Sequence, residues 1–208
     1  MSLAAALWKE SADLARAALG HRFVRGLGDG TLPLGDFQDY VAQDAFFLEA
    51  FARAYALALA RSPDRGGVEA FAGLLSGVIE ELELHGGYVE RWGASLDGVG
   101  PGEATLAYTE FLLSTAALGD VGEICAAMTP CMRLYAFLGR SLAEEGHDEE
   151  GPYAEWIRTY ADPGFEALAA RLEGLLDRYA DDTPAVRAAY RRAMRLEVAF
   201  FEANAGRA

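Results

Sequence analysis

Two carboxyl side chains occupy positions where helical spacing would bury them. Asp44 lies four residues after Tyr40 and three before Phe47, so it shares the aromatic side of a predicted helix. Glu197 lies three residues before Phe200, also on an apolar stripe. Because burying a carboxyl is costly unless it is paired, both residues are candidates for substrate binding or for acid and base catalysis.

The third candidate is the thiol of Cys131, which directly follows Pro130. A proline inside a helix removes a backbone hydrogen bond, so we expect a kink that opens the thiol to a cavity. Tyr135 lies four residues later on the same face, whereas Tyr108 and Tyr160 could stack on a flat ring and hydrogen-bond its edge. A nucleophilic thiol needs a base, which another helix must supply because no histidine is close in sequence.

Each candidate also has a structural interpretation. Asp44 could hydrogen-bond or cap a neighbouring helix, and Glu197 could pair with an arginine such as Arg133 or Arg53. A free cysteine such as Cys131 is most often a small buried hydrophobic residue. Residue type and spacing alone therefore leave both interpretations open.

The elements that must position these residues are all helical. Apolar residues recur at spacings of three and four, and no segment alternates with period two. Asp162-Pro163 and Thr183-Pro184 each predict an N-cap followed by proline in the first helical position. The expected helices cover about Ala4–Leu19, Arg22–Leu27, Asp36–Ala60, Gly67–Trp92, Glu103–Ala117, Val121–Glu145, Pro152–Tyr160, Gly164–Tyr179 and Ala185–Ala205. With no long linker, residues 1–208 are expected to form a single domain.

Charge and composition narrow the class of partner. The chain has 208 residues and a formal net charge of −14, so its field should repel nucleic acid and anionic membrane surfaces. No stretch approaches the roughly 18 uninterrupted apolar residues of a membrane span, and the first residues lack a signal-peptide pattern. We expect a cytoplasmic protein that binds a small molecule and contacts neither nucleic acid nor a membrane.

Cysteine and histidine usage argues against metal chemistry. Cys125 and Cys131 are six residues apart, a spacing that fits neither a disulfide framework nor a zinc site. His21, His85 and His147 lie singly on separate elements, too few for a metal centre on a helical bundle. No phosphate-binding glycine loop is present. We therefore expect free thiols, no metal and no cofactor.

Several short blocks form a pattern that covers almost the whole chain. They are Phe23–Pro33, Phe37–Tyr40, Gln43-Asp44, Phe51–Tyr55, Tyr108–Phe111, Pro130-Cys131 with Tyr135, Pro152–Ile157 with Tyr160, Leu196-Glu197 and Phe200-Phe201. In this order they resemble the TenA/THI-4 family, the thiaminase II group. The resemblance implies a heme-oxygenase-like helical bundle, commonly a homotetramer, that acts in thiamin salvage. Its substrate would be thiamin, a degraded thiamin bearing an aminomethylpyrimidine, or both, and its product 4-amino-5-hydroxymethyl-2-methylpyrimidine.

The resemblance also implies a role for each candidate. Cys131 would add to the electron-poor pyrimidine ring, and its presence is typical of the branch that keeps the active-site cysteine. Glu197 would act as acid and base at a ring nitrogen, with its pKa raised by burial. Asp44 would hold the amino group and the adjacent nitrogen. The aromatic residues that would bracket the ring and position the thiol are Tyr108, Tyr135 and Tyr160.

The chain departs from the family pattern at three positions. Phe47 replaces a frequent tyrosine, which removes a hydroxyl but keeps a stacking surface. Ala45 and Phe201 replace the usual tyrosine and tryptophan of their blocks. These changes bear on substrate preference more than on the reaction.

Two other functions fit the same pattern. A heme-binding protein of this fold would use His21 as the iron ligand, although the candidate pocket is rich in carboxyl groups and tyrosines. A non-catalytic pyrimidine-binding or regulatory module would keep the pocket without turnover. The presence of both Cys131 and Glu197 favours catalysis, because binding alone needs no nucleophile.

Overall fold

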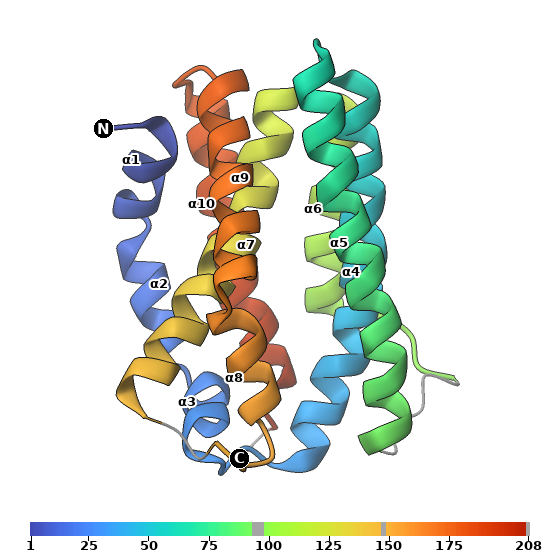
Figure 1. The fold of residues 1–208 in the computed structure, drawn as a ribbon, viewed down its shortest axis with the longest axis vertical. Helices are drawn as coiled ribbons and strands as arrows, with labels where there is room; N and C mark the ends of the chain where they lie inside the picture. The colour runs from blue at the N-terminus through green and yellow to red at the C-terminus, as the bar shows by residue number, and fades with distance from the viewer. Residues whose placement is uncertain (93–97, 147–148, 207–208) are drawn as a thin grey trace.

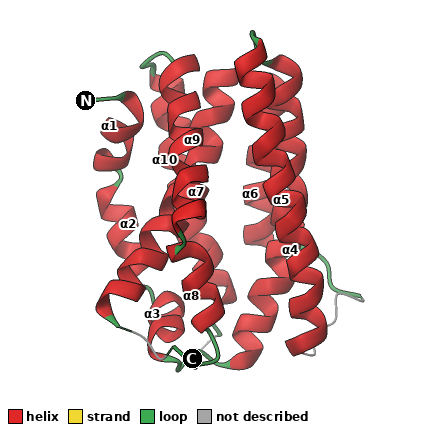
Figure 2. Cartoon of the chain, viewed as in Figure 1, coloured by secondary structure: helices red, strands yellow, loops and turns green. Residues whose placement is uncertain are grey.

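The computed structural model describes residues 1–92, 98–146 and 149–206, and the side chains of residues 83–92 are also outside the description. The side chains of His85 and Tyr88, together with His147, therefore lie outside the described residues. Within those ranges every regular element is a helix, as Figure 2 shows, which confirms the all-α prediction.

The described helices form an elongated bundle (Figure 1). Helices α4, α5 and α6 run along one side, beside α7, α9 and α10, while α1 and α2 lie on the outside of the second group. Their bounds are α1 Leu3–Glu10, α2 Ala12–Leu19, α3 Arg22–Asp29, α4 Leu34–Arg61, α5 Arg65–Trp92, α6 Glu103–Leu118, α7 Val121–Glu145, α8 Ala154–Ala161, α9 Pro163–Tyr179 and α10 Pro184–Asn204. The first and last residues of most helices agree with the sequence-based prediction within about two residues.

The predicted first helix, Ala4–Leu19, is wrong in one respect: it is divided at Ser11. The Ser11 N–H donates to Leu7 O and Trp8 O at 3.1 Å each, so the turn tightens there. Ser11 is nearly fully buried, and its side chain makes no capping hydrogen bond to α2. Neither glycine nor proline marks the break, which explains why the pattern did not indicate it.

Capping residues fix where the other helices begin and end. Asp162 accepts from the Gly164 N–H and Thr183 accepts from the Val186 N–H, which confirms both predicted N-caps. Helix α3 ends at Gly30, whose φ of 75° lies in the left-handed region that glycine adopts without strain. These caps set the lengths of the elements that carry the candidate site.

Helices α4 and α7 carry much of the core. Helix α4 packs on α5 and α6, whereas α7 packs on α8, α9 and α10. At Gly139 the backbone of α7 approaches α8 so closely that a Cβ would collide with the carbonyl carbon of Tyr160. Helix α7 remains helical through Pro130, and the kink expected there stays a prediction.

Candidate active site

A small cavity inside the bundle collects five of the seven candidate residues. Helix α4 contributes Asp44 and Phe47, α7 contributes Cys131 and Tyr135, and α8 contributes Tyr160. The remaining lining residues are Leu48, Phe51, Glu81, Met132 and Phe165. The space open to the centre of a water molecule is about 20 Å³, enough for about one water. The cavity is therefore narrow.

The other two candidates form a buried pair that does not line this cavity. The Tyr108 hydroxyl donates to Glu197 Oε1 at 2.6 Å, joining α6 to α10. Both side chains are almost completely buried, and the Tyr108 ring contacts the ring of Phe47 with centroids 4.7 Å apart. This hydrogen bond orients the Glu197 carboxyl within the core.

Burial changes the protonation of the carboxyl and the thiol. Loss of solvation raises the pKa of Glu197 to about 8, opposed by the Tyr108 hydrogen bond and reinforced by the charge of Asp44. Burial also raises the pKa of the Cys131 thiol well above its ordinary value, and the Glu197 carboxyl adds to that shift. At neutral pH the site therefore holds a protonated acid beside a neutral thiol.

The Tyr135 hydroxyl belongs to a network of aromatic side chains. Tyr40 donates to the Tyr135 hydroxyl at 3.0 Å, and the Trp156 indole N–H donates to the Tyr40 hydroxyl at 3.4 Å. The rings of Tyr135 and Tyr160 meet edge to face with centroids 4.8 Å apart. Three helices thus fix the orientation of the two tyrosines in the cavity wall.

Asp44 is central to the electrostatics of the site. Asp44 is buried on α4. Burial is the main cause that raises the pKa of Tyr135, Tyr160, Cys131 and Glu197, and the charge of Asp44 adds to each of these shifts. Asp44 is therefore close enough to all four groups to influence their ionisation. It also lines the cavity, where it can meet a polar ligand.

The structure does not pair Glu197 with either of the two arginines considered as its partners. Arg133 binds two carboxylates of α9, with Nη1 2.7 Å from Glu166 and Nη2 2.6 Å from Glu173. Arg53 pairs instead with Glu49 at 3.1 Å. Glu197 takes its hydrogen bond from a neutral hydroxyl, which leaves its raised pKa unopposed by a cation.

Glu81 is a cavity residue that the sequence analysis missed. It lines the cavity from α5, and its Oε1 accepts a hydrogen bond from the Tyr160 hydroxyl at 3.0 Å. A signal exists in the sequence, because Glu81 follows Leu74 and Val78 at spacings of seven and three, on the buried stripe of α5. The signal is obscured because Glu81 lies in a glutamate-rich stretch, with Glu80 directly before it and Glu83 two residues after it.

His21 is not placed to bind iron in a pocket. Its Nδ1 accepts from the Phe23 N–H at 3.2 Å and its Nε2 lies 2.7 Å from Glu202, so it caps α3 at the surface. Both ring nitrogens are engaged, which removes the lone pair that a heme would need. Among the residues that the structure describes, no group of three metal-ligating side chains comes together.

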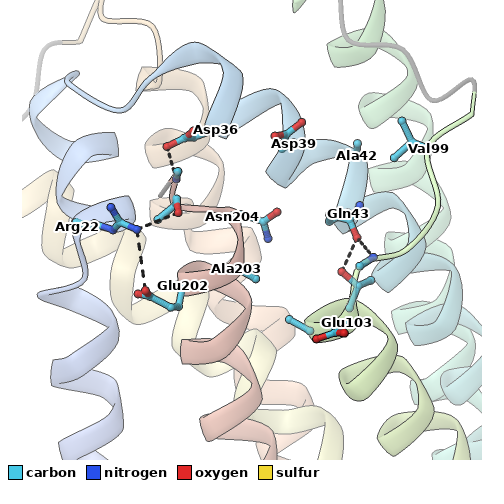
Figure 3. A pocket seen from close by; sticks show the side chains of 15 residues that line it. Arg22, Asp36, Asp39, Ala42, Gln43, Val99, Glu103, Glu202, Ala203 and Asn204 are labelled. Atoms are coloured by element: carbon cyan, nitrogen blue, oxygen red, sulfur yellow. Dashed lines mark hydrogen bonds and ion pairs between the residues drawn. The ribbon is translucent and has the colours of Figure 1, made fainter. Parts of the chain in front are cut away.

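A larger groove lies at one end of α4 and α10, where the polar groups mostly bind one another (Figure 3). Arg22 donates to Ala205 O at 3.0 Å, and Gln43 Oε1 accepts from the Gly102 N–H at 2.8 Å and from the Thr105 hydroxyl at 2.6 Å. Among the residues that the structure describes, no cysteine, histidine or tyrosine lines this groove. Gln43 thus anchors the start of α6, while its neighbour Asp44 faces the cavity.

No described helix of this chain combines the length and the apolar character that crossing a membrane requires.

Comparison with known proteins gives one consistent result. The model of the TENA/THI-4/PQQC family matches residues 7–207. The mitochondrial bifunctional TH2 protein of Arabidopsis thaliana is 37% identical over 86% of this chain, which spans only 33% of that protein. The aminopyrimidine aminohydrolase of Halalkalibacterium halodurans is 35% identical over 86% of this chain and 83% of its own length. A crystal structure described as a TenA family transcription regulator from Silicibacter superposes with a TM-score of 0.90, at 30% identity, over 98% of this chain and 96% of the other.

Proposed function

Because the chain belongs to the TENA/THI-4/PQQC family, we propose that it is a hydrolase of thiamin salvage that acts on an aminopyrimidine. Its product would be 4-amino-5-hydroxymethyl-2-methylpyrimidine, formed from the aminomethylpyrimidine of degraded thiamin, from thiamin, or from both. The expectation of an enzyme is confirmed by kinship with curated aminopyrimidine aminohydrolases at 26 to 35% identity.

One observation carries the proposed chemistry: a protonated carboxyl is held beside a buried thiol at the wall of a cavity. A carboxyl with a pKa of about 8 still carries its proton at neutral pH, so Glu197 can give it to a ring nitrogen. Protonation draws electrons from the ring and makes an adjacent carbon electrophilic. Cys131 lines the cavity and is the nucleophile that would attack there.

The raised pKa of the thiol favours addition as a neutral S–H group rather than as a preformed thiolate. In the proposed step a sulfur–carbon bond forms, Glu197 gives its proton to the ring nitrogen, and the same carboxylate takes the proton from Cys131. No net charge is created in the core, so the step avoids the cost of burying an unpaired thiolate. This accounts for a carboxyl that serves as both acid and base.

The remaining steps need only water. With the ring no longer aromatic, its electrons expel the leaving group and the exocyclic carbon–nitrogen bond breaks. Water adds to the exocyclic carbon, and loss of the thiol returns its proton and restores the ring. For an aminomethyl substrate, the protonated amine and one water become the hydroxymethyl product and ammonium, with no change of oxidation state.

The other assigned roles follow from the cavity. Asp44 would hold the amino group of the ring, while Phe47 and Tyr135 would offer flat surfaces for stacking. Tyr108 would hold Glu197 in place, and Tyr160 would close the wall beside the thiol. A homotetramer, a cytoplasmic location and a single domain over residues 1–208 belong to the same proposal, and light scattering on the purified protein tests the first.

The test is release of the hydroxymethyl product from 4-amino-5-aminomethyl-2-methylpyrimidine and from thiamin. Cys131→Ser and Glu197→Gln should each lose at least about a hundredfold in kcat/KM. Cys125→Ser is the matched control, because this second thiol is buried outside the cavity and its loss should leave turnover nearly unchanged. Folded wild-type protein that releases no product from either compound would refute the enzyme and favour a pyrimidine-binding module.

A further inference from the structure

We propose that Tyr40 is a positioning residue, which donates its hydroxyl proton to Tyr135 and so leaves the Tyr135 hydroxyl to donate to a lone pair of the bound pyrimidine. This inference rests on the proposed function, because it adds to the same site a residue that does not line the cavity. It is carried by two hydrogen bonds, by the aromatic surroundings of Tyr40 and by the place of Tyr135 in the cavity wall.

Two hydrogen bonds join three helices at the Tyr40 hydroxyl. The hydroxyl oxygens of Tyr40 on α4 and Tyr135 on α7 are 3.0 Å apart. The indole nitrogen of Trp156 on α8 lies 3.4 Å from the Tyr40 oxygen. Tyr135 lines the cavity, whereas Tyr40 and Trp156 do not. The two bonds therefore lead from the core to the cavity.

The surroundings of Tyr40 decide which hydroxyl donates. Tyr40 is almost fully buried, and its ring contacts four other rings, with centroids 5.0 to 6.4 Å away, namely those of Phe23, Phe37, Phe200 and Phe201. The indole N–H of Trp156 can donate a hydrogen bond but cannot accept one. Among the residues that the structure describes, the Tyr135 oxygen is thus the acceptor that the Tyr40 proton meets.

The opposite direction would leave a buried proton without an acceptor. If Tyr135 donated to Tyr40, the Tyr40 proton would point among aromatic rings, and a buried donor without an acceptor has lost its hydration for nothing in return. Two hydroxyls that share one hydrogen bond always leave one proton over. With Tyr40 as the donor, that proton belongs to Tyr135, whose side chain lines the cavity.

The chain of bonds also prepares the Tyr135 hydroxyl to donate. A hydroxyl whose oxygen accepts a hydrogen bond is polarised, so its own proton becomes a better donor. The bonds from Trp156 and from Tyr40 run in the same direction, toward Tyr135. Because the hydroxyl is already held in place, a ligand spends less free energy on ordering it.

A pyrimidine offers lone pairs that match this donor. Its ring nitrogens carry lone pairs in the plane of the ring, and the hydroxymethyl product adds an oxygen on its exocyclic carbon. Aromatic rings prefer to stack with an offset, so a ligand on the face of Tyr135 can keep one of these acceptors beside the hydroxyl. The compound 4-amino-2,5-dimethylpyrimidine keeps the ring nitrogens but lacks the oxygen, so it distinguishes the two.

The experiment is a double-mutant cycle on ligand binding. Calorimetry gives the Kd of the hydroxymethyl product and of the dimethyl compound for the wild type, Tyr40→Phe, Tyr135→Phe and the double variant. Phenylalanine removes the hydroxyl but keeps the ring that packs in the core. Tyr153→Phe is the matched control, because its hydroxyl is also buried and donates to Leu32 O, outside the cavity wall.

We expect Tyr40→Phe to raise the Kd of the hydroxymethyl product about 3- to 10-fold, and Tyr135→Phe at least as much. The double variant should bind no more weakly than Tyr135→Phe, because Tyr40 acts through Tyr135. Tyr153→Phe should stay within about twofold of the wild type. Equal weakening of the dimethyl compound supports the inference with a ring nitrogen as acceptor, and no weakening of it supports the inference with the exocyclic oxygen.

Two results would overturn the inference. If the separate effects of Tyr40→Phe and Tyr135→Phe multiply in the double variant, Tyr40 acts on packing and not through Tyr135. If Tyr135→Phe binds both ligands as the wild type does, the Tyr135 proton is used within the protein.

A spectroscopic measurement on the wild type tests the same inference if Tyr40→Phe does not fold. Tyrosine labelled with carbon-13 at Cζ shows separate signals for protonated and deuterated hydroxyls when their exchange with mixed light and heavy water is slow. The Tyr40 proton should exchange slowly with or without ligand, whereas that of Tyr135 should slow down when the pyrimidine binds. Protection of Tyr135 that does not change on binding would overturn the inference.

Failure of the proposed function gives a different pattern. If the wild type binds the hydroxymethyl product but releases none from either substrate, the chemistry is refuted, and the Kd values still decide the role of Tyr40. If the wild type binds neither pyrimidine, both the proposed site and the role of Tyr40 are refuted.

Discussion

Replacing Glu197 by glutamine should give the protein a higher free energy of unfolding than the wild type at alkaline pH. In the folded state the pKa of this carboxyl is about 8, against an ordinary value of 4.5. Between these two values the folded protein holds a proton that the unfolded chain has lost, so wild-type stability falls as pH rises. Glutamine keeps an acceptor for the Tyr108 hydroxyl and cannot titrate.

The two pKa values set the size of this effect. Relative to a protein whose Glu197 carboxyl is always protonated, the wild type has a free energy of unfolding that is lower by about 4 kcal/mol at pH 8. At pH 5 it is lower by only about 1 kcal/mol. The free energy of unfolding of Glu197→Gln, minus that of the wild type, should therefore grow by about 3 kcal/mol from pH 5 to pH 8. The other titrating groups contribute about equally to the stability of both proteins, so their contributions cancel in this difference.

Urea unfolding followed by circular dichroism at pH 5, 6, 7 and 8 measures the difference directly. Glu110→Gln, an exposed position on α6, is the control and should show a nearly constant difference. If Glu197→Gln and the wild type follow parallel curves across this range, the Glu197 carboxyl is not held protonated at neutral pH. The acid role assigned to it would then lose its physical basis.

Three further changes, one of them with a matched control, test the surroundings of the site. Tyr108→Phe removes a hydrogen bond that lowers the pKa of Glu197, so the acid's apparent pKa in the pH profile of kcat/KM should rise. Gly139→Ala should destabilise the fold by about 1 to 3 kcal/mol in urea unfolding and reduce turnover, because its Cβ would collide with the backbone of α8. Gly174→Ala, with open space at the same kind of helical position, should instead be neutral or stabilise by up to about 1 kcal/mol. Arg133→Ala should cost about 2 to 3 kcal/mol, by the same measurement, while leaving KM unchanged, because it strips two part-buried carboxylates of α9 of their partner.

Contrary results would be informative in each case. A lowered apparent pKa in Tyr108→Phe would mean that the hydroxyl donates to the protonated acid rather than to its anion. Equal stability of the Gly139 and Gly174 variants would contradict the close approach of α7 and α8. A raised KM in Arg133→Ala would place this residue in substrate binding instead of in the scaffold.

Local signals predicted the helices well because capping is a local property. Asp162 and Thr183 satisfy N–H groups two or three residues away, so sequence alone shows where α9 and α10 begin. The break at Ser11 escaped because neither glycine nor proline accompanies it. A single serine inside an apolar pattern is compatible with both a continuous and a divided helix.

The pairing of side chains across helices could not be predicted in the same way. Spacing showed that Glu197 faces the core, but not that its partner is Tyr108, 89 residues earlier in the chain. Arg133 was also a plausible partner of Glu197 until the structure showed that it pairs with two carboxylates of α9. Periodicity indicates which face is buried, whereas the helix that covers that face depends on tertiary packing.

The narrowness of the cavity has a kinetic consequence. Space for about one water molecule is too small for a substituted ring, so we expect side chains of the cavity wall to move before a ligand enters. In a stopped-flow experiment the observed rate should then level off at high pyrimidine concentration instead of rising in proportion to it. The plateau would measure how often the aromatic wall opens, a frequency set by the protein and independent of how often ligand molecules collide with it.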